Sequence, residues 1–221
     1  MYFDVHTLFQ FLPDLLDGLK LTILALILCF IFSALLGMVA CIGALSEGVL
    51  ARALARMYIN TFRVIPDIVL IFWIYYCLPL ILAIKLPTFT AGVIALSLTS
   101  GAFMAESFRA GIQAVPRGQV EASLALGLSI YPRWRLIILP PAIRWMMPAL
   151  INNFTDLLKH TTLLAGIGVA ELTYQAYTLG ASTFRYLEFL SAVAIAYFAI
   201  IFPLSMFARI AEFRLKARMI R

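Results

Sequence analysis

The feature that most constrains this chain is an apolar run from Leu21 to Ser46 that contains no charged residue. A helix needs about 20 apolar residues to cross the hydrocarbon core of a bilayer, so this run is long enough to span a membrane. The composition extends the argument to the whole chain: 63% of its residues are hydrophobic and 13% are charged, against about 25% charged in ordinary soluble domains. The chain is therefore predicted to be an integral membrane protein.

Further apolar segments complete a prediction of five transmembrane helices in a single transmembrane domain over residues 1–221. They are Ile68–Ile84, Leu86–Ala105, Ala142–Leu164 and Leu187–Ala208. The segment Ala142–Leu164 carries polar and charged side chains, so we expect it to face protein rather than lipid. The predicted fold class is all-α integral membrane.

The distribution of lysine and arginine predicts the orientation of these helices. With five spans and an external N-terminus, the outer segments hold 4 basic residues and the inner segments hold 13. The outer ones are Lys20, Lys85, Lys159 and Arg185. Membrane proteins carry such an excess on the cytoplasmic side, so the N-terminus is predicted outside, and the C-terminus and the loop at about 107–140 are predicted cytoplasmic. This bias also accounts for the net charge of +6, and no nucleic-acid partner is expected.

A short helix is predicted inside this cytoplasmic loop. Val120, Leu124 and Leu128 fall at i, i+4 and i+8 and form one stripe. Gly127 leaves a small, open position beside the stripe, Ser129 and Pro132 end the helix, and Leu136 begins the return into the membrane. Such a helix suits docking into the groove of another protein, and an ordinary interfacial helix that anchors a loop is the alternative.

The spacing of residues in this loop carries a family resemblance. Glu121-Ala122-Ser123, then Gly127, then Ile137, Leu139 and Pro140 resembles the EAA loop of bacterial ABC importer permeases, with Ser123 in place of the second alanine. The segments NTFR, AESFRAGIQAVPRGQ, LPPAIRWMMPALINN and LLKHTTLLAGIGVAEL are similar to the polar amino acid uptake branch of that family. The coupling-loop residues that the resemblance identifies are Gly118, Glu121, Ala122, Ser123, Gly127, Ile137, Leu139 and Pro140.

The resemblance implies the type I ABC importer permease fold in the bacterial cytoplasmic (inner) membrane. It implies a second permease subunit, identical or related, two cytoplasmic ABC ATPase subunits gripping the loop, and an extracytoplasmic solute-binding protein. The sequence has no G-x4-G-K-[S/T] motif, so this chain is expected to bind no cofactor, with ATP and Mg²⁺ on the partner ATPase. The expected function is therefore ATP-driven uptake of polar amino acids or related compounds. An alternative is a structural partner permease in a heterodimer that does not itself contact substrate.

Two departures from the family pattern concern ionisable residues. Asp67 stands where an apolar residue is usual, and His160 replaces the aspartate of a common KDTSL segment. Both bear on local charge and therefore on substrate preference.

Polar residues at membrane depth are costly, so they are the candidates for a substrate path. The candidates are Asn152, Asn153, Asp156, Lys159, Glu106, Asp67 and Glu171. Each also has a structural interpretation. The two asparagines can bridge helices. Asp156 with Lys159, and Glu106 with Arg109, can pair at i, i+3.

For the two remaining candidates, the structural interpretation rests on position in the chain. Asp67 is expected at the cytoplasmic start of the second span, where a helix N-terminus favours its charge. Glu171 is expected in an outer loop, either solvated, in contact with the binding protein, or in an outer vestibule.

Enzyme and metal chemistry have little support in the sequence. Asp156 and His160 at i, i+4 are the only residues that resemble an intramembrane catalytic dyad, and no serine nucleophile stands nearby. His160 has no second histidine or cysteine at ligand spacing, so no metal site is expected.

Overall fold

The computed structural model describes residues 5–217, and every regular element among them is helical. The helices before the loop are α1 Val5–Gln10, α2 Leu12–Leu45, α3 Val49–Val64, α4 Asp67–Phe72, η1 Trp73–Cys77, α5 Leu78–Leu82 and α6 Thr88–Gln113. Those from the loop onward are α7 Arg117–Ala125, α8 Ile130–Pro132, η2 Arg133–Ile138, α9 Leu139–His160, η3 Thr161–Ile167, α10 Leu172–Thr183 and α11 Tyr186–Ala217. The elements η1 and η2 are π-helical and η3 is a 3₁₀ helix.

The centre of the bundle is the pair α2 and α6, which approach closely because small residues line their contact. Cys29 and Ser33 of α2 are buried, and so are Ala95 and Ala102 of α6. A Cβ atom on Gly37 would lie 2.8 Å from the Cβ of Met104. Small residues let membrane helices pack backbone to backbone. The hydrophobic effect does not drive helices together in lipid, so this close van der Waals packing stabilises the pair instead.

Each of the two π-helical segments ends two positions before a proline. The segment η1 precedes Pro79, and η2 precedes Pro140 and Pro141. Proline has no N–H group and its ring clashes with the carbonyl four residues back. A local π turn lets the helix continue past that interruption.

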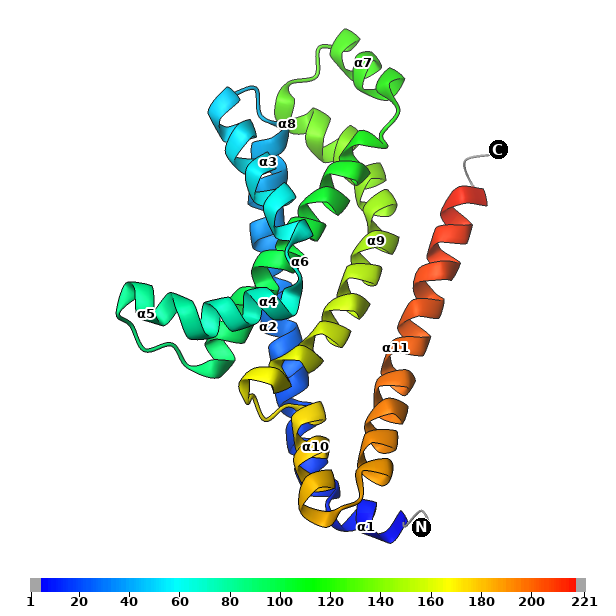
Figure 1. Cartoon of the computed structure of the whole chain (residues 1–221). Helices are drawn as coiled ribbons and strands as arrows, with labels where there is room; N and C mark the ends of the chain where they lie inside the picture. Colours follow the sequence, from blue (N-terminus) through cyan, green and yellow to red (C-terminus); the bar gives the residue numbers. More distant parts are fainter. Residues whose placement is uncertain (1–4, 218–221) are drawn as a thin grey trace.

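The predicted second span, Ile68–Ile84, coincides with the continuous helical segment from Asp67 to Leu82, but this segment is too short to count as a span without α3. The chain descends as α3 and then bends by 105° at a break before Asp67, so that α3 and the segment from Asp67 to Leu82 form one broken unit. Ile65 and Pro66 adopt extended backbone at the break, as expected at a residue before proline and at proline itself. Helix α5 consequently projects from the side of the bundle (Figure 1).

Three helices among residues 5–217 are long and apolar enough to cross a membrane by themselves, namely α2, α6 and the Tyr186–Ile210 part of α11. They contain most of the predicted first, third and last spans. The bent pair of α3 with the segment from Asp67 to Leu82 raises the number to four if it counts as one span. Helix α9 has 22 residues and coincides with most of the predicted span Ala142–Leu164. Its polar residues make it less apolar than the three helices that could cross a membrane by themselves.

The ends of the described chain lie at opposite ends of the bundle (Figure 1). Helix α7 stands at the end where α11 finishes, and α10 lies at the other end near α1. Helix α11 packs on α10 and α9 and leaves much of its surface uncovered, with Phe198 64% and Phe207 65% exposed.

Candidate functional site: the docking helix and a polar cavity

Helix α7 is held against the end of the bundle by a few small contacts. Val115, just before the helix, is buried, and Val120 packs against a cluster that includes Met104 and Phe108. Ser123 is 2% exposed, and its Oγ donates to the carbonyl of Val120 at 2.6 Å. Because Ser123 is small and satisfies its own hydroxyl, the helix can lie close to the bundle at this point.

Gly127 is an open position, as predicted, and it also ends the helix, a role that the prediction gave to Ser129 and Pro132. It has φ +71°, a left-handed conformation that glycine adopts at little cost. Its N–H donates to the carbonyl of Leu124 at 2.9 Å, and the N–H of Leu128 donates to that of Ser123 at 3.0 Å. These two bonds make a Schellman motif. The helix therefore stops at Ala125, several residues before the predicted terminators.

Those predicted terminators instead begin the next element. Ser129 is the N-cap of α8, and Pro132 is the last residue of that short helix. Arg133 closes the loop, since its Nη2 donates to the carbonyl of Leu128 at 2.8 Å. Leu136 lies in η2, which continues directly into α9. It is 64% exposed, and the first residue of this segment that is buried in the protein is Ile138, at 8%.

The outer surface of this loop is open. Glu121 and Ala122 are exposed, and a Cβ on Gly118 or Gly127 would meet no atom within 4 Å. Exposed apolar side chains accompany them, with Leu126 at 79%. Of the three motif residues after the helix, Ile137 is half-buried and Leu139 and Pro140 are exposed. We call the surface formed by residues 117–128 the docking surface.

A polar cavity of about 110 Å³ lies where α4, α6 and α9 meet. It is lined by Asp67, Thr99, Ser100, Phe103, Asn153, Asp156, Leu157 and His160. The structure thus brings together three of the predicted substrate-path residues, Asp67, Asn153 and Asp156. The sequence analysis missed Thr99 and Ser100, for which the only signal was a pair of adjacent hydroxyl residues within an apolar span.

Polar contacts organise the cavity. The Nδ2 of Asn153 donates to the Oγ of Ser107 at 2.9 Å. Asp67 Oδ2 lies 3.3 Å from His160 Nδ1, while Asp67 Oδ1 is buried without a hydrogen-bond partner. Lys159 pairs with Asp156 at 2.9 Å, and both side chains are more than half exposed.

Asp67 is the first residue of α4, so its predicted position at a helix N-terminus is confirmed. It contacts the last residue of α9, whereas the docking surface lies near the first. A helix of 22 residues is about 33 Å long, so Asp67 is far from the docking surface. Asp67 lies at this distance because α3 runs along the bundle away from the docking surface before the 105° bend that precedes Asp67.

Two other predicted residues lie outside the cavity. Asn152 is exposed and does not line it. Glu106 forms the alternative i, i+3 pair with Arg109, whose Nε lies 3.1 Å from Glu106 Oε1.

Glu171 is neither solvated nor exposed to a partner, contrary to the prediction. Its side chain is fully buried and caps α10, since Oε1 accepts from the N–H of Tyr174 at 2.8 Å. Oε2 accepts from the hydroxyl of Tyr197 on α11 at 3.2 Å. Thr22 on α2 lies 3.4 Å away and accepts from the N–H of Leu172 at 3.1 Å. This carboxyl therefore joins α2, α10 and α11.

We expect Glu171→Leu to lower the melting temperature of the purified protein by about 5 °C. The variant removes an N-cap worth about 1 kcal/mol and the hydrogen bond that Glu171 accepts from the Tyr197 hydroxyl, worth about 1 kcal/mol more. Glu171→Gln keeps an oxygen acceptor and should stay near wild type. Glu47→Leu, at an exposed position, is the matched control, and an equal loss there would contradict the capping role.

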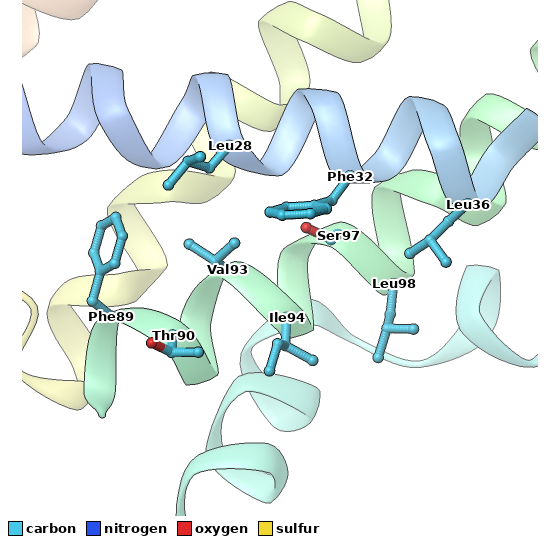
Figure 2. Close-up of a pocket in the computed structure, with 9 residues that line it drawn as sticks. All are labelled: Leu28, Phe32, Leu36, Phe89, Thr90, Val93, Ile94, Ser97 and Leu98. Atoms are coloured by element: carbon cyan, nitrogen blue, oxygen red, sulfur yellow. The ribbon is translucent and has the colours of Figure 1, made fainter. Parts of the chain in front are cut away.

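A second cavity, of about 400 Å³, is a groove between α2 and α6 with almost wholly apolar walls (Figure 2). Its only polar lining residues are Thr90 and Ser97. It offers no acid, base or anion site. Within residues 5–217, no group of three His, Cys, Asp or Glu side chains is placed to hold a metal ion.

The chain is similar to known permeases over almost its full length. The family described as "Binding-protein-dependent transport system inner membrane component" matches residues 33–219. The glutamine transport system permease protein GlnP of Escherichia coli (strain K12) is 36% identical over 217 residues, 98% of this chain and 99% of that protein. The arginine transport system permease protein ArtQ of Bacillus subtilis (strain 168) is 31% identical over 217 residues, again 98% and 99%.

Solved structures agree in fold. A crystal structure of an amino acid ABC transporter with histidines matches with a TM-score of 0.88 at 34% identity, covering 97% of this chain and 100% of that one. An inward-facing MetNI methionine ABC transporter matches with a TM-score of 0.67 at 19% identity, covering 94% and 99%, which supports the fold alone. The chain therefore belongs to the binding-protein-dependent transport system inner membrane components, among the amino acid ABC transporter permeases.

Proposed function

We propose that this chain is the membrane-spanning subunit of an ATP-driven importer that takes up polar amino acids across the bacterial cytoplasmic membrane. It pairs with a second permease, identical or related, and an extracytoplasmic binding protein delivers the substrate. Two separate ATPase subunits bind ATP and Mg²⁺ and grip the docking surface. ATP binding at the partner and substrate binding between the membrane helices are coupled because both shift the same equilibrium between two conformations of the complex.

The observation that carries this proposal is the construction of the docking surface. Its inner face is fixed by Val120 and Ser123, and its end is fixed by the Schellman motif at Gly127. Its outer face, which includes Glu121 and Leu126, is left uncovered. A rigid, exposed helix at the end of a bundle can transmit a push from a partner, whereas a flexible loop would absorb it.

We propose a topology of five crossings, namely α2, the bent unit of α3 to α5, α6, α9 and α11. The N-terminus then lies outside, and the docking surface shares the cytoplasmic side with the end of α11. The opposite positions of the two chain ends in Figure 1 support an odd number of crossings. The basic residues of the loop and of the end of α11, among them Arg117, Arg133, Arg135, Arg209 and Arg214, support the orientation.

We further propose that the substrate path runs past the polar cavity. The cavity offers carboxylate, amide and hydroxyl groups, which complement the charged ends of an amino acid. Its residues come from α4, α6 and α9, so relative movement of these helices would open or close it.

The test is uptake by the whole complex, purified with a tag on this chain and reconstituted in proteoliposomes. Uptake of a radiolabelled polar amino acid is expected to require both internal ATP and the external binding protein. A complex that hydrolyses ATP but accumulates no amino acid, across cationic, acidic and amide substrates, would overturn the proposed function.

Two adjacent asparagines give a matched test of the substrate path. Asn153 lines the cavity and Asn152 does not. Asn153→Ala is expected to weaken amino acid binding by the complex about tenfold, since a lost hydrogen bond in a charged network is worth about 1.5 kcal/mol. Asn152→Ala should change it less than twofold. Equal effects of the two variants would remove the cavity from the path, and no effect of either would favour a chain that does not contact substrate.

A further inference from the structure

The groove between α2 and α6 runs beside the line where these two helices contact each other (Figure 2). Side chains four positions apart form a row along one side of a helix. Two such rows flank the groove, namely Leu28, Phe32 and Leu36 on α2 and Thr90, Ile94 and Leu98 on α6. Between the rows the helices contact at small residues, with Ser33 Oγ 3.4 Å from the carbonyl oxygen of Ser97. The groove therefore results from large side chains on either side of a small-residue contact.

Hydrocarbon suits this groove better than water does. Leu28 and Leu36 are eight positions apart, so the groove is about 12 Å long, and its volume is about 400 Å³. A water molecule held in a cavity needs about two to four polar partners. The hydroxyls of Thr90 and Ser97 are seven positions apart, or about 10 Å along α6. One water molecule cannot bond to both, and Ser97 Oγ is buried without a hydrogen-bond partner.

The groove and the polar cavity lie on opposite sides of α6. Ile94 lines the groove and Phe103 lines the cavity. These residues are nine positions apart, which is about two and a half turns of an α-helix. Both α2 and α6 are long and apolar enough to cross a membrane. With the cavity on the proposed substrate path, the groove is open to the bilayer, and Phe32 in its wall is 48% exposed.

A basic residue stands near the end of the groove where α6 begins. Phe89, the second residue of α6, lines that end (Figure 2). Lys85 precedes it by four residues, so the two Cα atoms are within about 14 Å. Lys85 is exposed and has no ion-pair partner among residues 5–217. An ammonium group binds phosphate as a point charge, and each phospholipid headgroup carries a phosphate at the membrane surface.

We propose that the groove between α2 and α6 is a phospholipid site, in which one acyl chain fills the groove and the phosphate pairs with Lys85. A chain in the groove contacts two helices at once, whereas a chain on a convex helix surface has protein on one side only. Each added contact contributes dispersion energy, which an unfilled groove would forfeit. This inference goes beyond the proposed function and uses the proposed substrate path only to decide which side of α6 faces lipid.

The experiment labels the detergent-purified complex with a phosphatidylglycerol that carries a photoreactive diazirine in one acyl chain. Crosslinks in this chain, mapped by mass spectrometry, are expected at residues 28–36 and 89–98. Ile94→Trp places a larger side chain in the groove and should lower this labelling about tenfold, and Leu36→Trp should do the same from the other helix. Ile27→Trp is the matched control, because Ile27 is 47% exposed on α2 but does not line the groove. It should label as wild type.

A second pair of variants tests the headgroup contact. Lys85→Gln is expected to lower the amount of labelled lipid about threefold, the effect of an exposed ion pair, while the crosslinks stay at the same residues. Lys20→Gln is the matched control, since Lys20 already pairs with Asp17 on the exposed surface of α2. Equal losses in the two lysine variants would overturn the contact with Lys85.

The remaining outcomes decide the groove itself. Crosslinks spread evenly over the surfaces of α2 and α6, or labelling that both groove-filling variants leave unchanged, would overturn the phospholipid site. Size-exclusion profiles show whether each variant is assembled, and if one groove-filling variant does not assemble, the one on the other helix decides. A complex that fails the uptake test but is labelled in the groove loses the proposed function and keeps the lipid site. A complex that imports amino acids without labelling there loses the lipid site alone.

Discussion

Replacement of Gly127 by valine is expected to reduce ATP-driven uptake at least tenfold while the membrane helices stay folded. Gly127 has φ +71°, and a left-handed conformation costs an ordinary L-residue about 1–2 kcal/mol and a β-branched residue more. The valine would favour another backbone conformation. The two Schellman hydrogen bonds to Leu124 and Ser123 would then be lost, and α7 would no longer have a fixed end to present to the proposed ATPase partner.

Three measurements isolate this effect. Gly118→Val adds the same side chain to the same helix, where a Cβ also meets no neighbour but φ is not positive, so it should retain most uptake. Gly127→Asn should recover part of the loss, because asparagine tolerates the left-handed region better than valine. ATP hydrolysis by the Gly127→Val complex should continue without matching transport. Full uptake in this variant would mean that the helix end does not transmit the movement.

Replacement of Gly37 by valine is expected to prevent formation of the native bundle. The first added atom would lie 2.8 Å from the Cβ of Met104 and 2.9 Å from the carbonyl oxygen of Gly101. The carbonyl oxygen belongs to the backbone, so α2 and α6 would have to separate. Overpacking of this kind costs about 3 kcal/mol or more, a large part of the stability of a single domain.

The expected observation is loss of monodisperse protein in detergent, or a melting temperature at least 6 °C below wild type (~2 °C or more per kcal/mol). Gly48→Val is the matched control, since a Cβ there has its nearest neighbour at 3.9 Å. Similar behaviour of the two variants would show that the close approach of α2 and α6 is not needed for the fold.

Local sequence pattern predicted the parts of the fold that depend on apolar length. The uncharged run beginning at Leu21 appears within α2, and the last apolar segment appears within α11, because a continuous apolar stretch has few other conformations in lipid. The pattern located the helical segment Asp67–Leu82 through its prediction of Ile68–Ile84, but it did not show the 105° bend that joins this segment to α3. Whether a helix with prolines runs straight or bends depends on what its neighbours contact, and that information is not local.

The candidate site divides in the same way. The motif spacing from Glu121 to Pro140 selected the loop that holds α7, and its docking role stays a prediction, while the stripe of Val120, Leu124 and Leu128 placed the helix end too late. Residue types alone did not show that Gly127 stops the helix through backbone hydrogen bonds. Likewise the sequence identified Glu171 as an ionisable residue but not its burial, since its partners lie on helices remote in the chain.

By itself, the sequence determined that this chain enters a membrane, which segments are apolar, and which loop resembles a docking loop, because these properties depend on composition and short spacing. Only the tertiary structure decided which polar residues meet. Asp67 and His160 become neighbours because the bend after α3 brings the start of α4 to the far end of α9. The cost of burying a charge depends on its surroundings in space, and those surroundings exist only after the helices have packed.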